Sequence, residues 1–397
     1  MATPKLKLGN DKWATKQRSL LAYNDEGNNF KSLPFNVERL SGGSYVGRNG
    51  LVQYAASEEP RIDFTNYSKG ALLLEPQRTN YCLNSNNASQ WSTLISNGTV
   101  TKTGNYATAP DGTQTATRLQ ASVTGSGYAI LFASTTSISG NYSLSVYVKS
   151  NTGSNQSVAF YGRNTTLSTY TVTNEWQRLE LSGSQTGSEN SYLIVGINTS
   201  VGTPDNPIDI LVWGGQIEAG DYSTSLIPST ASAATRVQDY IAKGGNEYIF
   251  NDSEGVLFAE IKALANDQTY RFITISDNSS NSTRVVISFN TISNQIRCDL
   301  IVGGSTQSAF TTNSYDITQK NKVAIKYEFN NVKMFVNGLQ VGTTDTSANV
   351  FPSGTLNQIN FDNGNLGSTF YYEGFLNDLQ YFDTALTDAE LQTLTTL

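Results

Sequence analysis

The chain has 397 residues, enough for two or three domains, of which 38% are hydrophobic and only 15% are charged. Its net charge of −7, without any long basic run, argues against a nucleic-acid groove and a basic membrane patch. Because the chain contains no histidine, Ser-His-Asp and Cys-His catalytic sites, histidine-ligated zinc and haem ligation are excluded. The 21 tyrosines, 17 phenylalanines and 33 glycines indicate a folded, turn-rich β protein rather than a disordered chain.

Residues 1–80 are weakly periodic, and we expect them to form an N-terminal attachment or linker segment. The alternative is an extension of the first module. Short strands are expected at Trp13–Ala14 and Ser19–Tyr23. Residues 1–9 lack the apolar core of a signal peptide, and no stretch reaches the roughly 18 apolar residues of a membrane span. We therefore expect synthesis in the cytoplasm and no membrane insertion.

The end of this segment contains three consecutive leucines that are followed by a proline. This run, Ala71–Leu74 before Pro76, predicts a short buried strand that leads into a turn. Glu75 and Arg78 are expected to pair across that turn.

Residues 81–243 are predicted to form an antiparallel β-sandwich or jelly roll. Tyr142, Leu144, Val146 and Val148 alternate with more polar residues, which is the period of a strand with one buried face. Clusters of Gly, Ser, Asn and Thr separate this strand from the further candidates, which are Val158–Tyr161, Leu179–Leu181, Tyr192–Ile197 and Ile208–Trp213.

Residues 244–397 are predicted to form a second sandwich. Val323, Ile325 and Tyr327 alternate with other residues, and Asn337-Gly338 is a strong signal for a type I′ hairpin. Thr387 and Glu390 form a capping box that predicts a short helix at 387–394. The predicted fold class is thus all-β, with two tandem antiparallel jelly-roll or β-sandwich modules after an N-terminal attachment segment. Cys82 and Cys298 lie in different modules, so we expect no structural disulfide.

Three sets of segments resemble known families. Tyr142–Ser150 with Asn174–Leu179 resembles carbohydrate-binding modules of the family 4/9 jelly-roll type. A block similar to one that recurs in phage tail-fibre and other phage structural proteins comprises Leu211–Gly220, Ser225–Ser229 and Ala234–Arg236, with Leu72–Asn80 upstream. Residues 247–397 resemble a concanavalin A-like module of the laminin-G type, at Lys322–Tyr327, Met334–Gly338 and Tyr372–Leu379.

These resemblances imply a non-enzymatic virion protein of the tail-fibre type that binds glycans of the host surface. Other virion proteins would be partners of the N-terminal segment, and the fibre resemblance implies a homo-oligomer, specifically a trimer. One alternative is a purely structural head-fibre, capsid-decoration, neck or baseplate component, because a lectin-like fold does not fix function. A capsule depolymerase is the second alternative.

Glycan binding requires flat aromatic faces for sugar rings, with amide and charged groups for hydroxyls. Trp91 follows an Asn-rich loop, so we expect it to be partly exposed. Tyr128, Tyr161, Arg163 and Asn164 lie in or beside predicted loops and are candidates to line a cleft. Trp176 and Trp213 are assigned to the core, because they fall within strand patterns.

A calcium ion is often bound by laminin-G-type modules, so the resemblance suggests candidate ligands in loops. The clusters Asp277-Asn278 and Asp362-Asn363-Gly364-Asn365 carry suitable oxygens. They are also ordinary turn formers. No other cofactor is expected.

A glycoside hydrolase would need two carboxylates on either side of one bond, about 5–5.5 Å apart for retention or 6.5–9.5 Å for inversion. No Glu-x-Asp-x-x-Glu motif or close variant occurs. The sequence pairs Glu254 with Glu260, and Asp378 with Asp383, are interpreted as turn and surface residues. We therefore name no catalytic residue.

Overall fold

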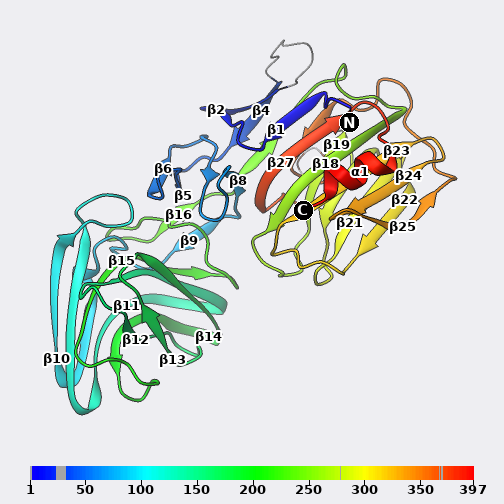
Figure 1. Ribbon diagram of the computed structural model, residues 1–397. Coiled ribbons are helices and arrows are strands. Elements are labelled where there is room, and N and C mark those ends of the chain that lie inside the picture. Colours follow the sequence, from blue (N-terminus) through cyan, green and yellow to red (C-terminus); the bar gives the residue numbers. More distant parts are fainter. Residues whose placement is uncertain (1, 24–32, 278, 366, 368–369) are drawn as a thin grey trace. The chain divides into compact units, whose positions relative to one another are not determined.

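The structure is a computed structural model that describes residues 2–23, 33–277, 279–365, 367 and 370–397. It divides into two compact units (Figure 1). Unit 1 comprises residues 1–50, 55–76 and 238–397, and unit 2 comprises residues 51–54 and 77–237. The all-β prediction is confirmed, because strands account for most of the described chain and α1 is its one α-helix.

Unit 1 is a sandwich of two large antiparallel sheets, which enclose one hydrophobic core. The first sheet has the order β25 (Leu339–Asp345), β24 (Val332–Val336), β23 (Asn321–Glu328), β18 (Glu254–Ala263), β27 (Gly374–Phe382), β8 (Ala71–Leu74) and β7 (Ile62–Asp63), and β1 (Leu6–Gly9) also pairs with β27. The second has the order β22 (Ser305–Thr312), β21 (Ile296–Val302), β20 (Arg284–Phe289), β19 (Arg271–Ser276) and β26 (Gln358–Asn360).

A smaller sheet of unit 1 has the order β17 (Tyr240–Ala242), β4 (Leu33–Glu38), β3 (Ser19–Ala22) and β2 (Ala14–Lys16). Strand β5 (Gly43–Val46) also belongs to this unit. The predicted capping box is present, because the Thr387 hydroxyl accepts from the Glu390 amide at the start of α1 (Asp388–Thr395). Buried Leu391 and Leu394 pack α1 over β23 and β24 (Figure 1).

The segment 1–80, for which we expected an attachment or linker segment, contributes strands to the sheets of unit 1. Strand β1 pairs with β27, and Leu6 and Leu8 are fully buried in the core of unit 1. The predicted buried strand Ala71–Leu74 is confirmed as β8, which also pairs with β27. The weak periodicity of 1–80 hid these strands because each is short and completes a sheet whose other members lie far along the sequence.

Glu75 does not pair with Arg78, so that prediction is wrong. Its carboxylate instead accepts from the buried Arg61 guanidinium at 2.6 Å. Arg61 also binds Asp239, which in turn binds Arg39 at 2.8 Å, and all these side chains are buried. The four charges balance one another inside unit 1, which is how such groups are accommodated in a protein interior.

Unit 2 is a second antiparallel sandwich with its own core. Its sheet has the order β10 (Ser92–Ala107), β11 (Ala116–Ser150), β14 (Gln177–Asn198), β12 (Gln156–Tyr161) and β13 (Ser168–Val172), and β15 (Ile208–Ala219) pairs with β11. The remaining elements are β6 (Val52–Ala55), β9 (Arg78–Asn80), β16 (Ala234–Arg236) and the 3-10 helix η2 (Ala88–Gln90). The strand predicted at Tyr142–Val148 is confirmed as part of β11, and its four apolar members are fully buried; Ser143 and Ser145 between them are also buried, so both faces of the strand are covered there. The predicted strands 179–181 and 192–197 are parts of one long strand, β14.

Candidate functional site

The outer face of the unit 2 sheet collects aromatic side chains from three neighbouring strands. On β11, Ala129 and Leu131 point into the core, so the alternate residues Tyr128 and Phe132 point outward and are half-buried. The register places Tyr128 opposite Asn198 and Phe132 opposite Ile194, and Tyr161 is also opposite Ile194. Because directly opposite residues share a face, these side chains form one surface. We call Tyr128, Phe132, Tyr161, Arg163, Tyr192 and Asn198 the aromatic face.

The Tyr161 ring lies along the sheet rather than upright. Its Cα is opposite Ile194, yet its hydroxyl accepts a hydrogen bond of 2.8 Å from the Asn198 amide, four residues further along β14. The side chain therefore extends along the strand direction, toward the Asn198 end of β14. Partial burial raises the Tyr161 pKa above its usual value, which the bond from Asn198 partly offsets. The Tyr161 side chain is thus partly buried and fixed at its hydroxyl end.

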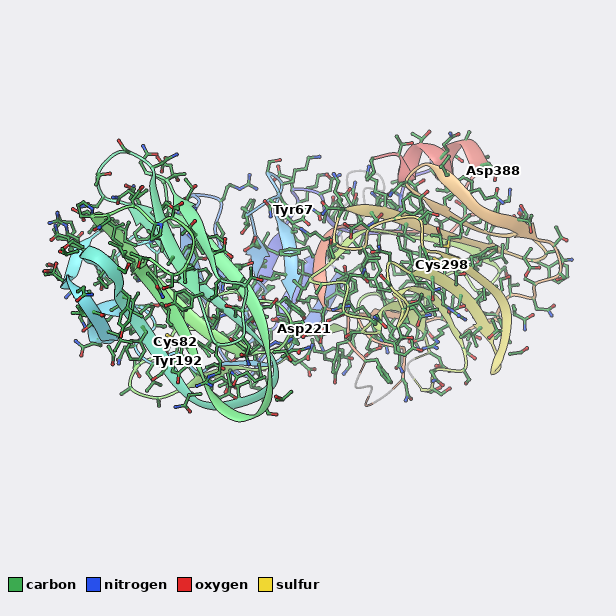
Figure 2. The ribbon with its side chains drawn as sticks, turned by 90° about the horizontal axis from the view of Figure 1, so that it is seen from below. Tyr67, Cys82, Tyr192, Asp221, Cys298 and Asp388 are labelled. Carbon is green, nitrogen blue, oxygen red and sulfur yellow. The ribbon has the colours of Figure 1, made fainter. Side chains whose placement is uncertain are left out.

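Tyr192 forms the other end of the aromatic face and carries a guanidinium group on its ring. The Arg163 guanidinium carbon lies 5.2 Å from the centre of the Tyr192 ring, and its Nη2 donates to the Tyr192 hydroxyl at 3.1 Å. Phe132 packs edge-on against Tyr192 with ring centres 6.4 Å apart. These contacts fix a planar charged group beside two aromatic rings (Tyr192 is labelled in Figure 2).

Such a surface combines apolar ring faces with fixed amide and guanidinium donors. Saccharides present both aliphatic ring faces and hydroxyl acceptors, so they match this combination. The face includes three of the residues singled out from the sequence: Tyr128, Tyr161 and Arg163. Asn164 is exposed beside it, and its amide nitrogen donates to the Ser184 carbonyl at 3.4 Å.

Trp91 lies in the core of unit 2, so the expectation of a partly exposed ring is wrong. It is 4% exposed, and its indole nitrogen donates to the Leu83 and Asn84 carbonyls at 3.1 and 3.3 Å. Trp213 is fully buried, as expected. Trp176 is partly buried and packs against the small hydrophobic cluster that contains Trp213. The polar loop before Trp91 supplies the backbone carbonyls that accept from the indole N–H. The ring can therefore be buried although the residues before it in the sequence are polar.

Phe132, Tyr192 and Asn198 were missed from the sequence. The signal was present, because Tyr128-Ile130-Phe132 and Tyr192-Ile194 repeat with a period of two, out of phase with core residues such as Leu131 and Val195. Strands that are apolar on both faces suggest a surface to be covered, but only the register shows that these runs are adjacent.

The loop residues considered for calcium satisfy their own turns. Asp277 accepts from the Ser279 amide and hydroxyl, and buried Asp362 accepts from the Tyr240 hydroxyl at 2.7 Å and the Gly364 amide. The side-chain oxygen of Asn363 accepts from the Asn365 amide at 3.2 Å. Asn278 lies outside the described residues. Among the residues that the structure describes, no group of three or more Asp, Glu, Cys or His side chains is arranged to hold a metal ion.

The carboxylates considered for hydrolysis pair differently from the expectation. Glu254 accepts from the Ala385 amide at 2.8 Å, and Asp383 lies 3.4 Å from Lys5, which are structural roles. Glu260 and Asp378, however, are directly opposite each other on β18 and β27. No sequence spacing reveals this pair, because 117 intervening residues separate the two strand positions.

The block that resembles phage structural proteins has a structural role within unit 2. The Asn80 amide donates to the Gly215 and Ile227 carbonyls at 3.1 and 2.8 Å, and its oxygen accepts from the Cys82 and Ile217 amides. Strand β9 pairs with β16 through Asn80 and Ala234. Buried polar groups that are fully satisfied in this way hold separate segments together.

The two cysteines, Cys82 and Cys298, are free and buried, and burial raises the pKa of both thiols.

The two units are both antiparallel β-sandwiches. Residues 239–392 match the family model Laminin_G_3, described as the concanavalin A-like lectin/glucanases superfamily. This part of unit 1 is therefore a concanavalin A-like module. No curated protein matches the sequence at a significant level. Within the described part of the chain, no helix is both long and apolar enough to cross a membrane.

Several solved structures are similar to the chain at low identity. The carbohydrate-binding module (CBM40) of the Ruminococcus gnavus IT-sialidase is 17% identical, with 39% of this chain and 94% of that chain covered and a TM-score of 0.33. Domain 4 of the arabinanase AbnA from Geobacillus stearothermophilus, in complex with arabinotriose, is 15% identical, covering 45% and 83%, with a TM-score of 0.30. The tandem CBM22 domains of Paenibacillus barcinonensis Xyn10C are 11% identical, covering 77% and 97%, with a TM-score of 0.26.

Proposed function

We propose that the chain is a non-enzymatic glycan-binding protein and that unit 2 binds saccharide on its aromatic face. The observation that supports this most directly is the half-buried Tyr161 side chain on the outer face of the sheet, whose hydroxyl is held by the bond from Asn198. A ring in this position is preorganised for stacking, so little side-chain entropy is lost on binding.

The ligand best suited to this surface is an extended chain of neutral sugars. The aromatic residues are spread over β11, β12 and β14, so several sugar units would lie across the strands, with ring faces over Tyr161 and Tyr128. The guanidinium of Arg163 would fix the orientation by donating to hydroxyl or acetamido oxygens. Weak single sites of this kind become effective when several copies act together.

Glycan-array binding of the whole chain, followed by titration calorimetry with the strongest hit, tests this proposal. Tyr161→Ala should weaken binding about tenfold, because a stacked ring contributes about 1–1.5 kcal/mol. The control is Tyr106→Ala. Tyr106 lies near the C-terminal end of β10, outside the aromatic face, and it is also an exposed tyrosine with an arginine, Arg118, over its ring. Equal affinities for both variants, or no array signal above background, would contradict the proposal.

We also propose that the protein is an appendage of a phage particle, with host-surface glycans as ligands and a trimer as the assembly. Support comes from the block Leu211–Gly220 with its companion segments, and from the acidic, neutral-polar composition. Cryo-electron microscopy of intact particles tests the location. Density for the chain at the distal tail is the expected result, whereas density on the head or neck would favour the purely structural alternative.

A further inference from the structure

A polar cavity of about 350 Å³ lies on the large sheet of unit 1. Its floor is a row of residues directly opposite one another on four strands, namely Lys322, Glu260, Asp378 and Gly9. Asn10, at the end of β1, and the loop 66–69 after β7 form its walls. Because residues in one row share a face of the sheet, both carboxylates of the row point to the cavity side.

Three buried polar atoms of this cavity lack a hydrogen-bond partner. They are the Tyr67 hydroxyl, Asn377 Oδ1 and Asp378 Oδ1. Asn377 is 8% and Asp378 6% exposed, so two of these atoms belong to residues that are more than nine-tenths buried, whereas Tyr67 is half-buried with its hydroxyl oxygen covered. Leaving a buried donor or acceptor unpaired is costly, and native proteins rarely do so without a ligand or water at the site. Three such atoms in one cavity therefore indicate a place for a bound molecule (Tyr67 is labelled in Figure 2).

A bulge in β27 brings the unpaired groups together. Glu260 is opposite Asp378 and Ile261 is opposite Leu376, so Asn377 is the extra residue between two registers. A bulge rotates the strand locally, which lets two consecutive residues reach the same cavity. The backbone N–H of Asn10 donates to the backbone carbonyl of Asn377 at 2.7 Å, and this bond ties the bulge to the end of β1. The Tyr67 ring is held by Phe375, with ring centres 5.4 Å apart, so its hydroxyl is placed rather than free to turn away.

The charges around the cavity restrict the chemistry of the occupant. Lys320 and Lys322 lie 3.5 and 3.9 Å from the Glu260 carboxylate, and Lys69 donates to the Asn10 side-chain oxygen at 2.8 Å. These ammonium groups disfavour a divalent cation. The unpaired oxygens of Asn377 and Asp378 disfavour an anion, which has no proton to offer them. A neutral molecule with several hydroxyls satisfies both sets, because each hydroxyl both donates and accepts.

We propose that this cavity of unit 1 binds one neutral pyranose unit, with sugar hydroxyls donating to Asn377 and Asp378 and accepting from Tyr67 and the lysines. The volume of about 350 Å³ is sufficient for a single sugar ring but not for a chain. The site lies in a different unit from the aromatic face, so it stands independently of the function proposed above.

The test is titration of the whole chain with methyl glucoside, methyl galactoside and methyl mannoside, observed by ligand-detected nuclear magnetic resonance. We expect one of them to bind with a millimolar Kd. Tyr67→Phe keeps the ring against Phe375 and removes only the hydroxyl, so it should weaken binding about tenfold. Tyr248→Phe, an equivalent change at a tyrosine of unit 1 that is 87% exposed, should leave the Kd unchanged.

Tyr161→Ala separates this proposal from the previous one. Loss of monosaccharide binding in Tyr161→Ala, with retention in Tyr67→Phe, would place the sugar on the aromatic face and overturn the cavity assignment. Absence of binding up to about 50 mM sugar would also overturn it. Calcium chloride, inorganic phosphate and glucosamine are the comparison probes, and tighter binding of any of them that depends on Tyr67 would replace the neutral sugar by that class of ligand.

Discussion

The aromatic face of unit 2 and the cavity of unit 1 represent opposite ways of building a binding surface. The face exposes rings whose polar groups are already bonded to one another, as in Tyr161 with Asn198 and Arg163 with Tyr192. The cavity instead buries single polar atoms that have no partner, which are the Tyr67 hydroxyl, Asn377 Oδ1 and Asp378 Oδ1.

The two surfaces differ in whether the unliganded protein is destabilised by the groups that bind the ligand. The face is stable without ligand, and affinity comes from covering apolar rings. The cavity carries an energetic cost in the unliganded protein, and a ligand removes it. Substitutions on the face should therefore affect binding more than stability, whereas substitutions in the cavity should affect both.

The largest effect is expected for Gly9→Ala, because the added methyl group on β1 would push against the bulge of β27 that forms part of the cavity. Gly9 has φ +93, and a Cβ there would lie 2.3 Å from the Asn377 carbonyl oxygen. We expect unit 1 to lose about 3 kcal/mol or more of unfolding free energy, and the sugar bound in the cavity to be lost. Thermal or denaturant unfolding followed by a probe of each unit measures this.

Gly50→Ala is the matched control for that experiment. Gly50 has φ +76, but nothing lies within 4 Å of a Cβ placed there. Its cost should be limited to backbone strain of about 1 kcal/mol. Equal losses for the two variants would show that the approach of β1 to the bulge is not tightly constrained.

Asp378→Asn should raise the stability of unit 1 at neutral pH. Burial raises the pKa of Asp378 from 3.8 to about 6; Lys7, Gln380 and Lys322 oppose this rise and Glu260 adds to it. Because the folded state holds the proton more tightly, stability is greatest below pH 3.8 and falls as the pH rises to about 6. The variant lacks this titration, so its advantage should grow to about 3 kcal/mol across that window. Urea unfolding at a series of pH values gives both curves, and a constant difference between them would contradict the prediction.

The smallest effect on stability is expected for Asn198→Ala on the aromatic face. The variant loses the bond to the Tyr161 hydroxyl and the exposed bond from the Ser200 amide, which together should cost unit 2 about 1–2 kcal/mol. Glycan affinity should fall about fivefold, because the Tyr161 ring is no longer held by the bond to its hydroxyl. Asn86→Ala removes a similar amide-to-tyrosine bond, to Tyr54 at 3.4 Å, and should leave the affinity unchanged. Calorimetry with both variants decides whether orientation of the ring matters for binding.

Local patterns in the sequence predicted the parts of the fold that depend on near neighbours. The strand at Tyr142–Val148, the Asn337-Gly338 turn with both φ angles positive, and the capping box of Thr387 and Glu390 were all confirmed. Each of these is fixed by residues within a few positions of one another.

The features that failed depend on pairing between distant segments. Trp91 was misplaced because its burial is set by packing against Gly215, where a Cβ would lie 2.3 Å from the indole ring. The cavity was invisible because Glu260 and Asp378 meet only through the β18–β27 register. Half of the aromatic face was likewise missed, since Phe132 and Tyr192 become neighbours only when β11 and β14 pair.

Pairing of β27 with β1 and β8 also determines the order in which the chain can fold. Leu6 is opposite Tyr381 and Leu72 is opposite Leu376, so the large sheet of unit 1 cannot close until its last strand has left the ribosome. The strands of unit 2 all precede residue 238 and can pair earlier. Until β27 arrives, β1 and β8 lack that partner strand and present open edges that are prone to aggregation. A protein that stops before β27 would leave both edges open at once.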